Sequence, residues 1–323
     1  MRIVLCYPVE PRHIEQIAAA APEAEVIDAG QEKIAHEILQ ADIFCGHAKV
    51  PVPWEQVVAN GRLRWIQSSA AGMDHCLVPS VIDSSILVTS ASGIFADQVA
   101  EHTLALLTGW LRNLPTFFLA AQRKEFIRRP TRDLHGATVG IVGMGGNGQR
   151  IAEVLAPFRL RLLATDLFPD AVRRPPAVEQ IWPADHLGEL FKVCDILILC
   201  LPLNPDTRGL INRDVFQQMK PDAVLVNVAR GPIVVEEDLV AALELRQLAG
   251  AALDVTETEP LPPTSRLWDL PNVLITPHVG AQSATRIDAT TRLFTENLKH
   301  FLVEHPLRNI VDKQLGFPVP GNE

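Results

Sequence analysis

The sequence predicts an α/β fold with two domains, each organised around a parallel β-sheet. Short apolar runs of strand length alternate with segments of helical periodicity along most of the chain. This alternation is typical of parallel sheets that helices cover on both faces. The length of 323 residues is consistent with about two domains of roughly 150 residues each. A glycine-rich turn that joins one such run to a helical segment is a second, local indication of this fold class.

Residues 1–97 are predicted to form a small α/β unit. They begin with the strand-like run 3–7, so the N-terminus is interpreted as a first strand rather than a signal peptide. The loop 68–74 directly follows another predicted strand and consists mostly of small residues. Backbone N–H groups in such a loop can hold an anion such as a carboxylate. A plain turn is the alternative, because Ala and Gly clusters also occur where a strand reverses.

Composition and charge exclude several classes of partner. The net charge is -9, so the chain lacks the excess of basic residues that is typical of proteins that bind nucleic acid or an anionic membrane. The longest apolar run, residues 196–201, is much shorter than the ~20 residues of a membrane span. The cysteines are odd in number and lack C-x-x-C spacing, which indicates buried thiols in a reducing cytoplasm. No histidine spacing typical of a metal site occurs in the sequence. We therefore expect a small-molecule substrate and no metal.

Residues 98–285 are predicted to form a Rossmann-like, dinucleotide-binding domain. Gly143, Gly145 and Gly148 have the G-x-G-x-x-G spacing, directly after a β-branched run and before a helical segment. This spacing lets the backbone approach a pyrophosphate and directs a helix N-terminus at it. Asp166 ends the next strand-like run about 20 residues further on, where a carboxylate binds the adenosine ribose hydroxyls. The alternative is a glycine turn in an α/β unit that binds no nucleotide.

A long helical segment precedes this turn and begins near Asp97, which we interpret as its N-cap. The apolar residues between Val99 and Leu111 form a wide surface, which indicates that the helix makes more than one contact. The second contact is either a subunit partner or the neighbouring domain. We expect a homodimer.

Four predicted strands of the second domain end in a polar residue suited to chemistry: Asp166, Arg230, Asp254 and His278. In a doubly wound sheet the carboxyl ends of the strands meet at one crevice, so these side chains are expected to form one site. The guanidinium of Arg230 can pair with a carboxylate and polarise an adjacent carbonyl. Its alternative role is a structural salt bridge. Three carboxylates within residues 254–259 are available to orient His278 as a general acid and base.

Five segments carry a resemblance to a known family: residues 143–148, 202–207, 227–231, 253–260 and 276–280. In order and spacing they resemble the successive signatures of the NAD-dependent D-2-hydroxyacid dehydrogenases. The resemblance covers nearly the whole chain and is strongest to the short hydroxypyruvate and glyoxylate reductase and D-lactate members. It implies reversible hydride transfer between NAD(H) and a small 2-hydroxy or 2-keto acid, and a discontinuous substrate domain to which residues 286–323 return as a C-terminal helix and tail.

The resemblance also implies roles for individual residues. Arg230, Glu259 and His278 would be the catalytic residues. Ala71 and Gly72 would offer backbone donors to the substrate carboxylate, which Arg230 and His278 would also contact. The contacts to the cofactor are expected from Gly143, Gly145, Gly146, Asn147, Gly148, Asp166, Leu201, Pro202, Thr207, Val228, Ala229, Arg230, Asp254 (at the nicotinamide carboxamide), His278 and Gly280.

Two departures from the family pattern concern the cofactor. Gly146 and Asn147 stand where the family usually has a basic and an aliphatic residue, which removes one pyrophosphate contact. Leu167 follows Asp166, whose carboxylate would repel a 2′-phosphate, so we expect NAD. The nearby basic pair at residues 173–174 leaves NADP open. A non-catalytic, NAD(H)-sensing protein-binding module of the same fold, as in the C-terminal-binding protein corepressors, is the alternative function.

Overall fold

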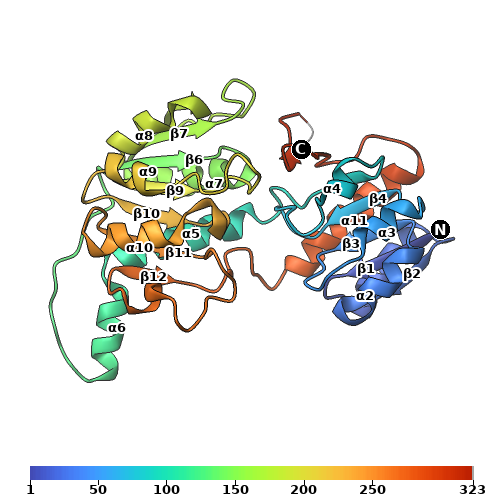
Figure 1. Ribbon diagram of the computed structural model, residues 1–323, viewed down its shortest axis with the longest axis horizontal. Coiled ribbons are helices and arrows are strands. Elements are labelled where there is room, and N and C mark those ends of the chain that lie inside the picture. Colours follow the sequence, from blue (N-terminus) through green and yellow to red (C-terminus); the bar gives the residue numbers. More distant parts are fainter. Residues whose placement is uncertain (322–323) are drawn as a thin grey trace. The chain divides into compact units, whose positions relative to one another are not determined.

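The computed structural model describes residues 1–321 and confirms the α/β fold (Figure 1). The chain divides into two compact units, one formed by residues 1–95 with the segment from 283 onward, the other by residues 96–282. The first unit contains a parallel sheet of five strands, and the second unit contains a parallel sheet of seven strands. Among the described residues, no helix combines the length and the apolarity that a membrane crossing requires.

The first unit is built on a five-stranded parallel sheet with the order β2-β1-β3-β4-β5. The strands β3 and β4 are buried along their whole length, as expected for a sheet covered on both faces. The strands are β1 (Arg2–Cys6), β2 (Glu25–Asp28), β3 (Ile43–Gly46), β4 (Trp65–Ser68) and β5 (Leu87–Thr89). The helices are α1 (Pro11–Ala20), α2 (Gly30–Glu37), α3 (Trp54–Ala59), α4 (Pro79–Ile82) and α11 (Arg286–Leu302).

The C-terminal helix α11 belongs to the first unit, although the whole second unit precedes it in the chain. It packs beside α1. Its Phe294 and Phe301 lie against the indole of Trp65 in β4, with ring centroids 5.4 and 5.1 Å apart. After α11 the chain forms a short antiparallel pair, β13 (Val311–Asp312) and β14 (Phe317–Pro318). The core of the first unit is therefore assembled from both ends of the chain.

The second unit has the strand order β12-β11-β10-β9-β6-β7-β8. The chain starts at β6, extends the sheet to one edge through β7 and β8, and then crosses to β9 on the other side of β6. The topological switch point therefore lies between β6 and β9, and ligands of open α/β sheets bind at the carboxyl ends of such strands. The strands are β6 (Thr138–Val142), β7 (Arg161–Asp166), β8 (Val178–Pro183), β9 (Ile196–Leu199), β10 (Val224–Asn227), β11 (Gly250–Leu253) and β12 (Val273–Ile275).

Helices cover both faces of this sheet and form two apolar cores, one with α5 and α7, the other with α8, α9 and α10. The predicted N-cap at Asp97 is wrong, because α5 already begins at Ala96 and Asp97 lies in its first turn. There the positive end of the helix dipole stabilises the carboxylate of Asp97, which also pairs with Arg150 of α7. The helices are α5 (Ala96–Leu111), α6 (Leu114–Gln122), α7 (Gly146–Leu155), α8 (Leu187–Val193), α9 (Arg213–Gln218) and α10 (Glu236–Glu244).

Trp110 anchors the C-terminal end of α5 on the sheet. Its indole Nε1 donates a hydrogen bond to the carbonyl oxygen of Asn272 at 2.8 Å. The same ring covers Gly250 at the start of β11, where a Cβ would lie 2.2 Å from it, so only glycine admits the helix this closely. From this point α5 crosses β10, β11 and β12.

Candidate active site

The glycine turn after β6 packs closely against its neighbours at two of its three glycines. Gly143 has a φ of +96°, and a Cβ there would lie 3.0 Å from the carbonyl oxygen of Cys200. A Cβ at Gly148 would lie 2.0 Å from the carbonyl oxygen of Gly143. A Cβ at Gly145 would meet no atom of the described residues within 4 Å. The first and third glycines therefore permit internal packing, and the second leaves open space at the start of α7, where a pyrophosphate would bind.

The start of α7 offers an anion mainly backbone groups. The helix begins at Gly146, with Gly145 as an extended N-cap, and its first turn carries no acidic side chain. The guanidinium of Arg150, the first basic residue of α7, is paired with Asp97. Attraction for an anion therefore comes from the unpaired N–H groups and the helix dipole. This is the position at which Gly146 and Asn147 replace the usual basic and aliphatic pair.

Asp166 closes the glycine turn from the end of β7. Its Oδ2 accepts the backbone N–H of Met144 at 2.7 Å, and its Oδ1 accepts that of Phe168 at 2.8 Å. A carboxylate oxygen can accept two hydrogen bonds, so both oxygens can also serve a ribose hydroxyl. The nearby Arg173 is paired with Glu153 of α7, which lowers its attraction for a 2′-phosphate. Its neighbour Arg174 donates to the carbonyl oxygen of Glu179 at 2.7 Å.

The loop after β9 closes on itself beside the switch point. The hydroxyl of Thr207 donates to the carbonyl oxygen of Pro202 at 2.7 Å and accepts the N–H of Asn204 at 2.9 Å. Just before this loop, the thiol of Cys200 donates to the carbonyl oxygen of Gly143 at 3.0 Å. Burial raises the pKa of this thiol, so Cys200 is a neutral packing group rather than a nucleophile. Of the predicted contact residues, Leu201 lies beside the glycine turn, where a Cβ at Gly143 would be 3.1 Å from its Cα, and Pro202 and Thr207 follow in the loop.

Arg230 lies in the loop 228–231 after β10, and a buried amide holds this loop. Asn227 accepts the N–H of Ala229 at 3.0 Å and donates to the carbonyl oxygen of Arg230 at 3.1 Å. The next residue, Gly231, packs against the loop that follows β11, where a Cβ would lie 1.8 Å from the carbonyl oxygen of Thr256. No other residue type fits there. This contact brings the Arg230 loop against residues 254–259.

Glu259 and His278 form a hydrogen-bonded pair near Arg230. His278 Nδ1 lies 2.8 Å from Glu259 Oε2, and the two side chains are 44% and 37% exposed. Burial raises the pKa of Glu259, but the hydrogen bond and charge of His278, the N–H of Thr256 and the charge of Arg230 outweigh burial and lower it overall. Ionised Glu259 therefore accepts Nδ1–H from His278. The other ring nitrogen, Nε2, is left to carry an exchangeable proton.

Asp254 anchors the turn that carries His278. Its backbone carbonyl oxygen accepts the N–H of His278 at 2.7 Å, and its carboxylate accepts those of Val279 at 2.9 Å and Gly280 at 2.8 Å. Three successive backbone donors therefore converge on one residue. His278 adopts a left-handed φ of 54°, which costs a non-glycine residue about 1–2 kcal/mol. The bonds to Asp254 offset this cost.

His102 of α5 is a member of the site that the sequence patterns did not indicate. Its Nε2 lies 2.9 Å from Thr276 Oγ1 and 3.1 Å from Asp254 Oδ1. Thr276 Oγ1 in turn lies 2.7 Å from Asp254 Oδ1. The signal in the sequence is a polar residue within the apolar surface of α5, and that pattern alone is more typical of a satisfied core histidine.

Ala71 and Gly72 lie in the first unit, in the loop after β4. Ser68 Oγ accepts the backbone N–H two residues later at 3.0 Å, which tightens the start of this loop. The rings of His47 and His75 stack with centroids 4.0 Å apart, and His75 Nε2 lies 3.3 Å from Ser68 Oγ. The expected carboxylate-binding loop therefore has two imidazole rings beside it in its own unit, a feature that the sequence patterns also did not indicate.

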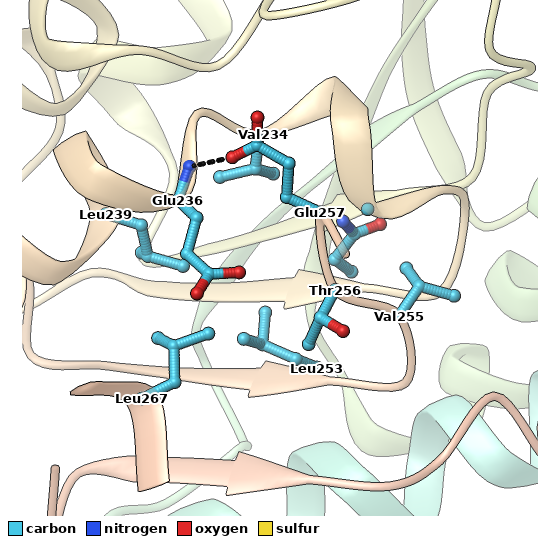
Figure 2. A pocket seen from close by; sticks show the side chains of 10 residues that line it. Val234, Glu236, Leu239, Leu253, Val255, Thr256, Glu257 and Leu267 are labelled. Carbon is cyan, nitrogen blue, oxygen red and sulfur yellow. Dashed lines mark hydrogen bonds between the residues drawn. The ribbon is translucent and has the colours of Figure 1, made fainter. Parts of the chain in front are cut away.

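A small pocket lies beneath the loops that follow β10 and β11 (Figure 2). It has about 10 Å³ of space, enough for one water molecule. Leu239, Leu253 and Leu267 line it, so it belongs to the packing that supports these loops. At its wall Glu257 accepts the N–H of Glu236, the first residue of α10, at 2.9 Å (Figure 2). The three carboxylates of residues 254–259 thus have different partners.

A dinucleotide-binding sheet with a carboxylate-paired histidine at its strand ends is the architecture of a nicotinamide-dependent oxidoreductase. Residues 104–280 match the family model described as "D-isomer specific 2-hydroxyacid dehydrogenase, NAD binding domain". This match covers more than half of the chain. The chain therefore belongs to the D-isomer specific 2-hydroxyacid dehydrogenase family, whose members are NAD(P)-dependent oxidoreductases that act on CH–OH donors.

Individual relatives agree with this assignment. A glyoxylate reductase/hydroxypyruvate reductase from Mus musculus is 35% identical over 74% of this chain and 74% of its own length. A solved family member from Aeromonas salmonicida is 28% identical, with a TM-score of 0.82 over 97% of this chain and 99% of its own. An NADPH-dependent glyoxylate/hydroxypyruvate reductase from Sinorhizobium meliloti, solved with NADP and sulfate, is also 28% identical, with a TM-score of 0.79 over 98% and 99% of the two chains.

We expect Asp254→Asn to lower the free energy of unfolding by about 1.5–3 kcal/mol at pH 7, because the buried donors lose a charged acceptor. Burial raises the pKa of Asp254, but hydrogen bonds from His102, Thr276 and the 279–280 backbone lower it overall. Its stabilisation is therefore fully present above the ordinary carboxyl pKa near ~4 and is lost as the pH falls through the lower folded-state value. Urea unfolding at several pH values measures this. Asp170→Asn, at an exposed position, is the control. The expectation is contradicted if the wild-type protein still has a higher free energy of unfolding than Asp254→Asn at a pH below the folded-state pKa of Asp254.

Proposed function

We propose that the protein is a 2-keto acid reductase that transfers a hydride reversibly between NAD(H) and a small acid such as glyoxylate, hydroxypyruvate or a D-lactate-like acid. The observation that carries this proposal is the hydrogen-bonded pair of Glu259 and His278, in which Oε2 and Nδ1 lie 2.8 Å apart. The charge of Arg230 acts on the same carboxylate and lowers its pKa. The reductase names of the mouse and Sinorhizobium relatives support it. We assign it to the cytoplasm, because its cysteines are free thiols and such thiols fit a reducing compartment.

His278 is the proton donor for the reduction in this proposal. Its Nδ1–H is held by ionised Glu259, so Nε2 gives a proton to the carbonyl oxygen and takes it back in the reverse direction. Glu259 fixes the orientation of the ring and balances the charge of the imidazolium. The nicotinamide, when bound, supplies the hydride that goes to the carbonyl carbon.

In this proposal each unit has its own binding role. The first unit, bounded from the sequence at residues 1–97 with 286–323, is the substrate domain, and its Ala71 and Gly72 offer backbone N–H groups to the substrate carboxylate. The second unit, bounded from the sequence at residues 98–285, is the cofactor domain. Arg230 pairs its guanidinium with the substrate carboxylate and polarises the adjacent carbonyl. For the nicotinamide carboxamide we propose Asp254 Oδ2, which takes one hydrogen bond within the described residues, whereas Oδ1 has three donors around it.

We propose NAD as the preferred cofactor. Asp166 lies where the adenosine ribose would bind, and its charge disfavours a 2′-phosphate. Arg173, the first basic residue after Asp166 in the chain, is already paired with Glu153. The Sinorhizobium relative is NADPH-dependent, so a preference for NAD would distinguish the present chain from it.

We further propose that the protein is a homodimer that associates through α6 and the chain that follows it. Figure 1 shows α6 projecting from the rest of the second unit. The helix and the following loop expose Phe118 by 65%, Leu119 by 54% and Phe126 by 95%. Large apolar side chains gathered on one exposed segment are typical of a protein interface. A second copy of the chain carries the same apolar segment, as a two-fold contact requires.

Substitution of His278 by Gln should lower kcat by about 10²–10⁴-fold, because the reaction loses its proton donor. NADH absorbance with glyoxylate or hydroxypyruvate measures turnover, and NADH fluorescence measures cofactor binding, which should be nearly unchanged. His135→Gln, at an exposed position of the same unit, should retain the wild-type rate. Normal turnover by His278→Gln would remove His278 from the mechanism. A wild-type protein that reduces no 2-keto acid but retains peptides in a pull-down would favour the non-catalytic alternative.

Replacement of Asp166 by Ser should shift the cofactor preference from NADH toward NADPH. The repulsion between two unit charges about 4 Å apart amounts to ~1–4 kcal/mol at the dielectric constants of water and of a protein surface. The ratio of kcat/KM with NADH to kcat/KM with NADPH should therefore fall by about fivefold or more. The exposed carboxylate of Asp170 provides the matched control Asp170→Ser. Wild-type preference for NADPH, or an unchanged ratio in Asp166→Ser, would rule out the proposed selection.

Phe118→Asp should convert the proposed dimer into monomers, because it places a charge in the apolar contact of both copies. Size-exclusion chromatography with light scattering gives the mass. Leu245→Asp alters another exposed apolar residue, 70% exposed and outside this segment, and should leave the mass unchanged. The proposal fails if the wild-type protein is monomeric at micromolar concentration.

A further inference from the structure

The hydrogen bonds among His102, Thr276 and Asp254 have a defined direction. Ionised Asp254 only accepts, so the single hydroxyl proton of Thr276 is donated to its Oδ1. Thr276 Oγ1 is then an acceptor toward His102 Nε2, which lies 2.9 Å away. Because Nε2 also lies 3.1 Å from Asp254 Oδ1, its proton is shared between the two oxygens. His102 therefore carries a proton on Nε2.

The position of His102 along the strands is set at the other end of α5. There Trp110 packs on Gly250 and donates to the carbonyl oxygen of Asn272 at 2.8 Å. The helix from Trp110 back to His102 rises by about 12 Å. The strand from Gly250 to Asp254 advances by about 13 Å. Because helix and strand cover nearly equal lengths, the contact at the start of β11 places His102 level with the carboxylate at its end.

We infer that His102 is a positioning residue for the proposed reduction: its Nε2–H fixes the Asp254 carboxylate, which in turn holds the backbone turn 278–280 that carries the proton donor. This inference rests on the proposed function for its effect on turnover. The His102 and Asp254 side chains are 19% and 4% exposed, so water is poorly placed to replace the bond between them. His102 acts on the reacting atoms only through other residues.

Matched variants separate positioning from folding. His102→Leu removes the donor, and His102→Gln keeps an N–H close to the position of Nε2. Thr276→Val removes the bridging hydroxyl at similar volume, and His135→Leu is an exposed control. With saturating NADH and glyoxylate, His102→Leu should lower kcat by about 10- to 100-fold, the range for a hydrogen bond to a charged group. The dissociation constant for NADH should change much less than kcat, because most of the proposed cofactor contacts lie around the untouched glycine turn and only Asp254 is shared.

The pattern across the variants decides the inference. His102→Gln should recover most of the lost rate. His102→Leu combined with Thr276→Val should be no slower than the slower single variant, because both act on one carboxylate. Full kcat in His102→Leu, no recovery in His102→Gln, or multiplicative losses in the double variant would overturn it. If His102→Leu fails to fold, His102→Gln and Thr276→Val still make the comparison.

A second readout needs no turnover. Amide hydrogen exchange at Val279 and Gly280 should be faster in His102→Leu than in the wild-type protein, because Asp254 holds both N–H groups less firmly. Equal exchange rates would overturn the inference. If the wild-type protein reduces no 2-keto acid, the proposed function fails, and the exchange rates still show whether His102 positions the turn.

Discussion

The buried carboxylate of Asp254 organises the carboxyl edge of the second sheet. An ionised carboxylate withdrawn from water is tolerated only where donors use its acceptor capacity. Here the donors come from three directions: His102 on α5, Thr276 just after β12, and the backbone of residues 279–280. Each donor gains a partner only if the other elements are in place. The orientation of His278 is therefore a result of how β11, β12 and α5 pack, and Glu259 has only to hold the ring.

The two halves of the proposed cofactor site use different physical means. Around the glycine turn the described groups are mostly uncharged: open space at Gly145, backbone N–H groups at the start of α7, and Arg150 committed to an ion pair. At the proposed reacting end, charges dominate, because Arg230 and His278 both act on the carboxylate of Glu259. A diphosphate bound mainly by amides depends less on ionic strength than one bound by a basic side chain, whereas the reacting end depends on which protons are present.

Periodicity and glycine spacing predicted the alternating elements, the parallel sheets and the cofactor turn, because these features depend on residues close together in the chain. The contacts that give the site its geometry join distant segments. Nothing local to Gly231 indicates that a Cβ there would collide with the Thr256 carbonyl, and nothing in the helix 96–111 distinguishes His102 from a satisfied core residue. Likewise the three acids of residues 254–259 look alike in the sequence. Their different partners follow from loop paths that only the assembled sheet determines.

The return of α11 to the first unit affects the order in which the protein can mature on the ribosome. Residues 96–282 are continuous, so every strand of the seven-stranded sheet emerges before the helix that carries Phe294 and Phe301. Until then Trp65 lacks the rings that cover it. The part of the chain synthesised first therefore completes its core last, because the sheet face that α1 and α11 cover together has only α1 on it during translation of the second unit. Nascent chains with such a delay expose apolar surface for longer and depend on chaperones to avoid aggregation.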